Sequence, residues 1–392
     1  MALTSFFTDV SSEMIINVLP LFLANVLGVK TNVIGLIEGV AETTASLLKS
    51  VSGWLSDKLR QRKSLAVLGY ALSAFSKPFL YFATSWAGVL FVRFADRVGK
   101  GVRTSPRDAL IADSVDEHQR GRAFGLHRAG DTAGAVLGLL IALLVVLATQ
   151  SQSLALSRET FQLLVLISIV PAFLAVIILA MGVKEVPIKI KTGQAVRLSF
   201  NALDSRFRSF LLIIIVFTLG SSADAFLVLR AQDLGLSVVG VLAMLMTFNI
   251  IYAALARPLG ILSDRIGRTQ LLIVGWLIYA GVYLGFALAG AVWQVWVLYG
   301  IYGLYYAFTE GAAKALIADF VPSEQRGTAY GYYNAAIGLM ALPASVLAGV
   351  LWQGIGGWAG FGASAPFIVG AVFAIIAVIL LILWDRQQKA SA

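Results

Sequence analysis

The sequence predicts an all-α integral membrane protein with twelve transmembrane helices in two related six-helix halves. Three observations support this: a composition too apolar for a soluble domain, a series of bilayer-length apolar runs, and a repeat that relates the halves. Of the 392 residues, 59% are hydrophobic and 13% are charged, whereas soluble domains have roughly a quarter of their residues charged. The lack of cysteine excludes a disulfide-stapled secreted scaffold, and the apolar content excludes intrinsic disorder.

Each predicted helix is an apolar run of about 20 residues or more, the length that crosses a bilayer. The first run begins almost at the N-terminus with no basic segment before it and no small-residue cleavage site, so we expect a retained helix and no cleaved signal peptide. Long apolar runs also differ from the ten-residue alternations of outer-membrane barrels. The twelve runs are 5–27, 32–55, 64–84, 87–113, 122–147, 161–182, 208–230, 237–261, 269–290, 293–319, 326–351 and 364–385.

The basic residues predict the orientation of these helices, because cytoplasmic connections of membrane proteins are enriched in Lys and Arg. The even-numbered connections carry most of the basic residues, and the odd-numbered ones carry only Lys30, Arg158 and Arg230. We therefore expect a multi-pass protein of the inner (cytoplasmic) membrane with both termini in the cytoplasm. The net charge of +9 then reflects loops that face anionic lipid, and no nucleic-acid partner is expected.

The longest basic connection, 184–207, is predicted to be a cytoplasmic linker. It separates an N-terminal six-helix bundle, 1–183, from a C-terminal six-helix bundle, 208–392. An even number of helices in each half gives both halves the same orientation, so the two bundles are parallel repeats about an axis along the membrane normal.

Sequence matches between the halves support this repeat. ALIAD and QRG recur at one offset of 206 residues, and the GWLSDK and GILSDR segments correspond at an offset of 207. Chance does not produce several such matches in order at one spacing. The matched segments are 109–113 with 315–319, 119–121 with 325–327, and 53–58 with 260–265.

At these motifs the chain resembles the major facilitator superfamily over essentially its whole length. GILSDRIGR at 260–268 fits the family signature G-x-L-(A/S)-D-(R/K)-x-G-R at every defined position. The first-half copy at 53–63 has Arg60 and Gln61 where glycine and arginine are usual. The resemblance implies the major facilitator fold and a secondary transporter that works by alternating access, not an enzyme.

Two further motifs carry the resemblance. The R-x-x-x-G motif of the family's fourth helix is matched by Arg97 and Gly101. The fifth predicted helix is similar to the small-residue motif of exporters through Gly130, Gly134 and Gly138, with Leu139 in place of the usual proline. These features resemble the bacterial drug/proton antiporter-like branch.

Charged residues at the predicted cytoplasmic ends recur in both halves and suggest conformational gating. The aspartate of each GxLSD motif can accept backbone N–H groups at a neighbouring helix N-terminus, and the arginine after each motif can pair with the aspartate that ends ALIAD. Such networks hold one conformer and release in the other. The alternative is that these residues only set the orientation of the helices. The predicted gating residues are Asp57, Arg62, Asp113, Asp264, Arg268 and Asp319.

A charged stripe runs along the fourth predicted helix. At 100° per residue its six charges fall within an arc of about 120°. Each charge at the bilayer centre costs roughly 2.5–3.5 kcal/mol, so the stripe must line a cavity or pair with acids on other helices. Arg103 and Arg107 can instead extend to the cytoplasmic rim. The six residues are Arg93, Asp96, Arg97, Lys100, Arg103 and Arg107.

Five acids on neighbouring helices are candidate partners, and two pairs of them have i,i+4 spacing and so share a helix face. Burial raises a carboxylate's pKa and a nearby arginine lowers it, so an acid that exchanges these environments can carry a proton. We predict this coupling role for Asp9 or Glu13 near Arg97, then for Asp131. A static ion pair is the alternative for each acid. The five are Asp9, Glu13, Glu38, Glu42 and Asp131.

Two other sites were considered. His127 and Asp131 supply metal-ligand types, but Arg128 lies between them and the chain has two histidines, so no metal is predicted. In the second half, Asp224 in the polar GSSADAF segment is the best cavity candidate, whereas Glu310 and Lys314 can neutralise each other. The predicted coupling or cavity residues are Asp9, Glu13, Arg93, Arg97, His127, Asp131 and Asp224.

The expected function follows from this asymmetric cavity, which has a charged N-terminal wall and an aromatic C-terminal wall. It suits a small, amphipathic or charged organic substrate. The sequence has no phosphate-binding loop and no domain for a cofactor, so we expect no cofactor and an ion gradient as the energy source. We expect a monomeric exporter driven by proton antiport, with its substrate, protons and lipid as partners. The alternatives are uptake by proton symport, export of a lipid-like or metal-chelate substrate, and a receptor or scaffold without transport.

Overall fold

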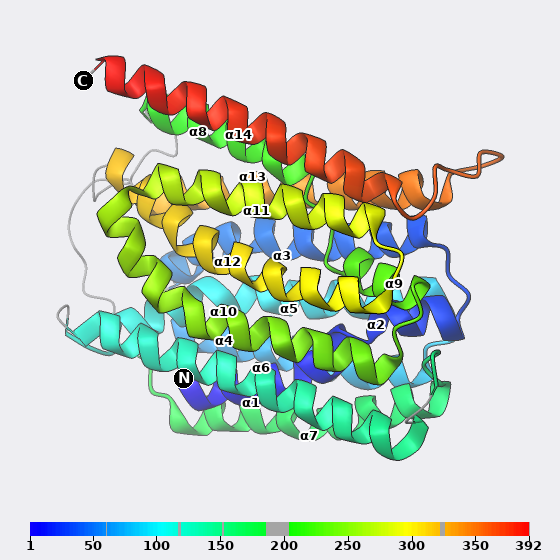
Figure 1. The fold of residues 1–392 in the computed structure, drawn as a ribbon. Coiled ribbons are helices and arrows are strands. Elements are labelled where there is room, and N and C mark those ends of the chain that lie inside the picture. Colours follow the sequence, from blue (N-terminus) through cyan, green and yellow to red (C-terminus); the bar gives the residue numbers. More distant parts are fainter. Residues whose placement is uncertain (60, 117–118, 151–152, 186–203, 322–325, 392) are drawn as a thin grey trace.

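A computed structural model describes residues 1–59, 61–116, 119–150, 153–185, 204–321 and 326–391 of the chain. These residues form long helices that lie side by side, and the chain begins and ends at the same end of the bundle (Figure 1). We refer to this end as the predicted cytoplasmic end and to the opposite one as the predicted external end.

The first half contains six membrane-crossing units, as predicted. The first unit is interrupted and the third ends in a short, tighter helical segment. In order, the units are α1 (Ala2–Ile16) with α2 (Leu19–Leu21) and η1 (Phe22–Val26), α3 (Thr31–Leu59), α4 (Arg62–Ser76) with η2 (Lys77–Phe82), α5 (Trp86–Asp113), α6 (Arg120–Gln150) and α7 (Arg158–Gly182).

The second half repeats this arrangement with six further units, the first of which is again broken. They are α8 (Ser205–Leu219) with α9 (Ala225–Asp233), α10 (Val238–Ile266), α11 (Arg268–Leu288), α12 (Val292–Phe320), α13 (Arg326–Gln353) and α14 (Ala365–Ser391). The fold class and the twelve predicted helices are therefore confirmed. Most of the predicted linker 184–207 lies outside the described residues, so the domain boundaries stay a prediction.

Two helices are interrupted near the centre of the molecule. Gly220 ends α8 and Asp224 precedes α9, which confirms the predicted polar break. The first helix was predicted to be continuous over 5–27, and this is wrong: α1 ends at Ile16 and the chain restarts before Pro20. Pro20 has no backbone N–H to donate to the carbonyl oxygen of Ile16 and crowds the preceding turn, which favours an interruption at this point.

Close contact between α1 and α6 depends on three glycines. A Cβ on Gly130 would lie 2.8 Å from the carbonyl oxygen of Ala2, and one on Gly138 would lie 2.6 Å from that of Val10. A Cβ on Gly134 would overlap the carbonyl oxygen of Phe6. The glycines of the small-residue motif therefore hold α1, with its two acids, close against α6.

The two halves meet along α3 and α13, which are also packed through small residues. A Cβ on Gly349 would lie 2.5 Å from the Cα of Asn32, and one on Gly39 would lie 2.8 Å from that of Leu342. Near the predicted external end, the Asn32 side-chain amide donates to the carbonyl oxygen of Gly354 at 3.0 Å. This seam fixes the relative position of the acids on α3 and the cavity between the halves.

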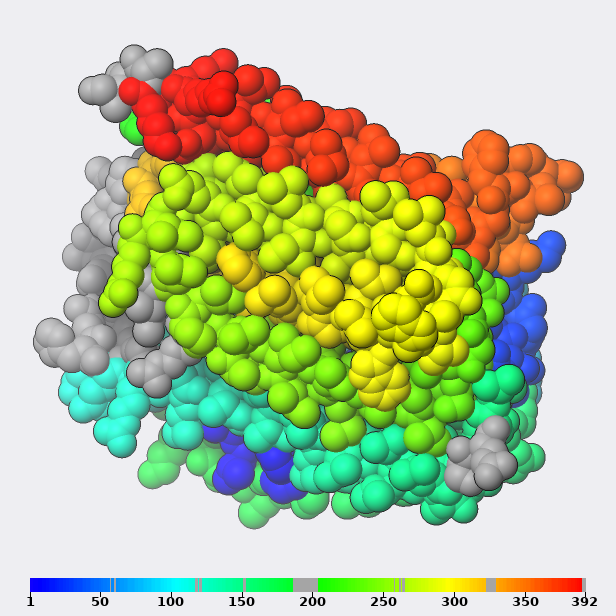
Figure 2. Space-filling view, viewed as in Figure 1, coloured from blue at the N-terminus to red at the C-terminus, as the bar shows by residue number. Residues whose placement is uncertain are grey.

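The outer surface is suited to lipid. Within the described part of the chain, eight helical segments are long and apolar enough to cross a membrane, and the more polar helices α3, α5 and α12 are not among them. The face shown in Figure 2 is formed largely by α10, α11 and α12. On α11, the side chains of Val274, Leu277, Leu284 and Leu288 are exposed, as lipid-facing residues are expected to be.

Candidate functional site

A central cavity of about 470 Å³ lies between the two halves. Helices from both halves contribute to it: α1, α3 and α5 from the first half, and α8, α9, α10, α12 and α13 from the second. Its charged lining residues are Glu13 on α1, Glu38 and Glu42 on α3, Arg93 and Arg97 on α5, and Asp224 before α9.

Two parallel ion pairs form one wall of the cavity. The Arg93 guanidinium contacts the Glu38 carboxylate at 2.7 Å, and the Arg97 guanidinium contacts the Glu42 carboxylate at 3.3 Å. Helices α3 and α5 run in the same direction, and both pairs have the same four-residue spacing. Two arginines of the predicted stripe, Arg93 and Arg97, are thus neutralised by α3, and Arg97 faces the cavity rather than lipid.

The two remaining carboxylates of the cavity have neutral hydrogen-bond partners. The Asn17 amide donates to Glu13 at 2.7 Å, and the Tyr302 hydroxyl donates to Asp224 at 2.8 Å. Asp224 precedes α9, but its side chain does not cap that helix. Glu13 and Asp224 therefore bring one carboxylate from each half to the cavity.

Aromatic residues form the opposite wall, as predicted, although not all the predicted ones take part. Phe248 on α10 and Tyr299 and Tyr306 on α12 line the cavity. Phe248 packs edge-on against Tyr299 and Tyr306, with ring centroids 5.5 and 5.4 Å apart. Tyr302 packs behind them, so the wall is a continuous aromatic cluster.

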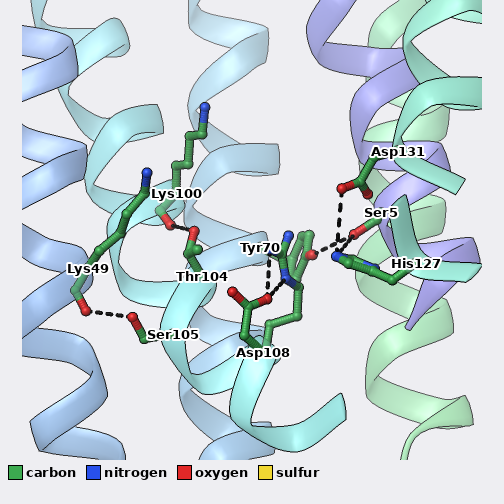
Figure 3. A network of polar contacts seen from close by, with 10 residues as sticks. Ser5, Lys49, Tyr70, Lys100, Thr104, Ser105, Asp108, His127 and Asp131 are labelled. Atoms are coloured by element: carbon green, nitrogen blue, oxygen red, sulfur yellow. Dashed lines mark hydrogen bonds and ion pairs between the residues drawn. The ribbon is translucent and has the colours of Figure 1, made fainter. Parts of the chain in front are cut away.

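A second polar cluster lies inside the first half, away from the central cavity (Figure 3). The His127 ring on α6 lies 3.5 Å from the Ser5 hydroxyl and 3.7 Å from the Asp131 carboxylate, and Ser5 contacts the Tyr70 hydroxyl at 3.4 Å. Asp9 is half-buried and makes no hydrogen bond or ion pair with any residue that the structure describes. Within this part of the chain, no three histidine or carboxylate groups are arranged to hold a metal.

The rest of the stripe on α5 turns away from the cavity. Arg103 is buried, donates to the Ser73 hydroxyl at 2.8 Å and lies over the Tyr70 ring. Arg107 pairs with the adjacent Asp108. The alternative in which Arg103 extends to the rim is therefore wrong, because its guanidinium finds a hydroxyl and an aromatic ring inside the bundle.

The predicted rim pairs are present in both halves. Arg62 pairs with Asp113 and also donates to the carbonyl oxygen of Ala109. Arg268 pairs with Asp319 at 2.6 Å and donates to the corresponding carbonyl of Ala315. In each half, an arginine thus binds the ALIAD segment through the same carboxylate and the same backbone carbonyl. The side chains of Asp57 and Asp264 lie outside the described part of the structure, so their predicted contacts are not seen.

A polar contact that the sequence did not suggest joins the halves nearer the predicted cytoplasmic end. Arg128 on α6 donates to the Tyr252 hydroxyl at 2.7 Å and contacts Glu310 at 3.3 Å. Lys314 also contacts Glu310 at 3.2 Å, so the predicted i,i+4 pair has an additional partner from the other half. At the predicted external end, Gln232 donates to the carbonyl oxygen of Leu154 at 2.8 Å.

Several cavity residues were not identified from the sequence. Asn17 follows the end of α1, and Ser46 and Ser345 lie within helices; none of them has a charge or belongs to a motif, so no signal distinguishes them. Lys77 is different, because it is a buried cation whose ammonium donates to the hydroxyls of Ser11 and Ser12 at 2.6 and 3.0 Å. A lysine within an apolar segment is costly to bury, so its position could have identified Lys77 from the sequence.

Apolar outer faces, two six-helix halves and a charged cavity at their interface define a multi-pass membrane transporter. The family model for the Major Facilitator Superfamily matches residues 1–230 and 209–392. The chain is 37% identical over 356 residues to "Uncharacterized MFS-type transporter MJ1317" of Methanocaldococcus jannaschii, covering 89% of this chain and 87% of that protein. The chain belongs to the Major Facilitator Superfamily; it is a secondary transporter and not an enzyme.

Other similarities are more distant. The chain is 25% identical over 307 residues to the multi-drug resistance efflux pump PmrA of Streptococcus pneumoniae, covering 74% of this chain and 73% of that protein. The crystal structure of a point mutant of the nucleoside transporter NupG superposes with a TM-score of 0.79 at 12% identity, covering 98% of each chain. At this identity the structural similarity shows the fold alone.

Proposed function

We propose that the protein exports a small charged organic molecule from the cytoplasm in exchange for protons. The observation that carries the proposal is the central cavity, to which both halves contribute carboxylates and in which two arginines are already paired. Charges buried between two movable bundles are costly to retain unless they bind a substrate or an ion. The low-identity similarity to a multidrug efflux pump agrees with export.

The proposed coupling route consists of acids on α1 and α6. Glu13 lines the cavity, and Asp9 lies one helical turn away on the same face. The carboxylates of Asp131 and Glu13 are both close enough to Asp9 to repel its ionised form. His127 lies next to Asp131. These four side chains form a series of groups able to hold a proton, from the cavity toward the predicted cytoplasmic end.

The ion pairs at the predicted cytoplasmic rim have the gating role in this mechanism. The pairs Arg62–Asp113 and Arg268–Asp319 each tie the start of one helix to the end of another within the same half. They keep the ends of each bundle rigid, so that the bundles rock as units about the cavity. Asp57 and Asp264 are expected to belong to the same networks.

The experiment compares gradient-driven transport with substrate exchange in liposomes. A panel of small organic ions is first screened by thermal stabilisation of the purified protein, because a ligand that binds the native state raises its apparent stability. The compound that stabilises most is then used in both assays. Asp9→Asn or Glu13→Gln is expected to abolish accumulation driven by a pH gradient, while exchange persists at substrate concentrations that saturate the site. Asp385→Asn, at the far end of α14 and paired with Lys389, is the control.

The other outcomes would each refute a part of this proposal. If both substitutions leave gradient-driven transport at the wild-type level, the coupling assignment is refuted. Accumulation that requires protons to move with the substrate identifies uptake by symport and refutes antiport. If Asp9→Asn and Glu13→Gln only reduce stability, the two acids have a structural role and carry no proton. A receptor or scaffold would show neither transport nor exchange.

A further inference from the structure

We propose that the substrate is an organic cation, with its positive group between Glu13 and Asp224 and its apolar part against Phe248, Tyr299 and Tyr306. This inference rests on the proposed function and adds the sign of the substrate's charge and the residues that recognise it. It is carried by the charge balance of the cavity, by the contacts of two carboxylates, and by the nature of the facing wall.

The charge balance of the cavity lining is negative. Four carboxylates and two guanidinium groups line the cavity. Both guanidinium groups are committed to ion pairs, Arg93 with Glu38 and Arg97 with Glu42. Each pair is neutral, so the unbalanced charge of the lining resides on the other two carboxylates.

These two carboxylates are available to a ligand. Glu13 receives the Asn17 amide on one oxygen, and Asp224 receives the Tyr302 hydroxyl on one oxygen. Their second oxygens have no hydrogen-bond partner among the described residues, and both side chains line the cavity. A cation is the ligand charge that balances this arrangement.

Other cations near the cavity do not change this balance. Lys49 and Lys100 attract the Glu42 carboxylate electrostatically from the predicted cytoplasmic side. Neither lysine lines the cavity. Lys77 donates to two serine hydroxyls behind α1. An anion at the centre of the cavity would therefore meet two carboxylates before it met an unpaired positive group.

The aromatic wall favours the same class of ligand. An organic cation is attracted to the electron-rich face of Tyr or Phe, and more strongly as water is excluded. Phe248, Tyr299 and Tyr306 belong to the second half, as Asp224 does, whereas Glu13 belongs to the first. A ligand that spans the cavity thus contacts both halves, and its binding responds to their relative movement.

A cation and a proton would compete for the same carboxylates. Binding of the cation requires Glu13 and Asp224 to be ionised, so any proton held by either group is released when the cation binds. Return of a proton then expels the cation. This competition is the exchange that an antiporter needs, and it is measurable as proton release without any transport.

The test uses two water-soluble probes of similar size and opposite charge, benzyltrimethylammonium and phenylmethanesulfonate. Binding to the purified wild-type protein is measured by calorimetry, and proton release is followed with a pH indicator in weakly buffered detergent solution. We expect benzyltrimethylammonium to bind and to release protons, with weaker affinity at lower pH. We expect no binding of phenylmethanesulfonate. Preferential binding of the anion, or cation binding without proton release, overturns the proposal.

Variants locate the site. Glu13→Gln and Asp224→Asn are each expected to weaken cation binding roughly 30-fold or more, as loss of a desolvated charge partner does, and Asp385→Asn to leave it unchanged. Unchanged affinity in both cavity variants refutes the assignment. Size-exclusion profiles show which variants fold, and the wild-type comparison of the two probes decides the sign of the charge if a variant does not.

The result is separable from that of the proposed function. Cation binding with proton release, but without gradient-driven transport in liposomes, upholds this inference and refutes proton-coupled transport. Gradient-driven transport of phenylmethanesulfonate but not of benzyltrimethylammonium upholds proton-coupled transport and refutes the cation site.

Discussion

Glu38→Gln is expected to destabilise the protein much more than Glu42→Gln, although both remove one partner of a cavity arginine. The difference comes from burial. The exposed fraction of the Glu38 side chain is 7% and that of Glu42 is 44%, whereas their arginines are both 4% exposed. Water reaches the second pair and screens it, but not the first.

The magnitudes follow from these values. Removing one partner of a buried ion pair leaves an uncompensated charge and costs about 3–5 kcal/mol, which we expect for Glu38→Gln. A partly exposed pair contributes about 1 kcal/mol or less, which we expect for Glu42→Gln. Glutamine has nearly the same shape as glutamate, so neither substitution creates a cavity. The double variant Arg93→Gln with Glu38→Gln is expected to recover part of the loss, because no charge then remains unpaired.

Unfolding of the purified protein by increasing SDS in mixed micelles measures these free energies. A double-mutant cycle for each pair isolates the interaction from the effect of each side chain alone. Equal losses for the two single variants, or a loss below about 1 kcal/mol for Glu38→Gln, would show that burial does not control the strength of these pairs.

Three further predictions concern the packing of α1 against α6, the gating residues and the contact between the halves. Gly134→Ala is expected to cost about 1–3 kcal/mol because its Cβ overlaps a backbone oxygen of α1, whereas Gly125→Ala, where a Cβ meets nothing within 4 Å, is expected to be neutral or stabilising in the same unfolding assay. Asp57→Asn or Asp264→Asn is expected to slow transport while substrate affinity stays nearly unchanged, and loss of binding with normal exchange rates would refute gating. Arg128→Gln is expected to increase labelling, from the predicted cytoplasmic side, of a single cysteine introduced at the cavity residue Ser46, and unchanged labelling would show that the Arg128 contact does not hold the halves together.

The fold was largely predictable because its signals are local in the sequence. A run of apolar residues must cross the bilayer wherever it packs, and the polar segment before Asp224 cannot remain helical within it. The break before Pro20 was missed because the flanking residues of that segment are apolar. Proline in a membrane helix does not by itself show whether the helix bends or breaks.

The partners of the arginines were not predictable for a geometric reason. Asp9 and Glu13 have the same four-residue spacing as Glu38 and Glu42, so either pair matches the spacing of Arg93 and Arg97. Only the three-dimensional structure shows that α3 lies alongside α5 in the same direction. The Arg128 contact was equally hidden, because it depends on how the two halves approach each other.

The central claim is that the cavity opens alternately to the two sides, and paired spin-label distances test it most directly. The chain has no cysteine, so labels can be placed at Lys30 and Ile355, exposed at the predicted external end, and at Arg122 and Arg265, exposed at the predicted cytoplasmic end. Distances are measured in lipid nanodiscs at two pH values, with and without benzyltrimethylammonium. We expect one distance to lengthen as the other shortens. Distances that both stay constant, or that change in the same direction, would contradict it.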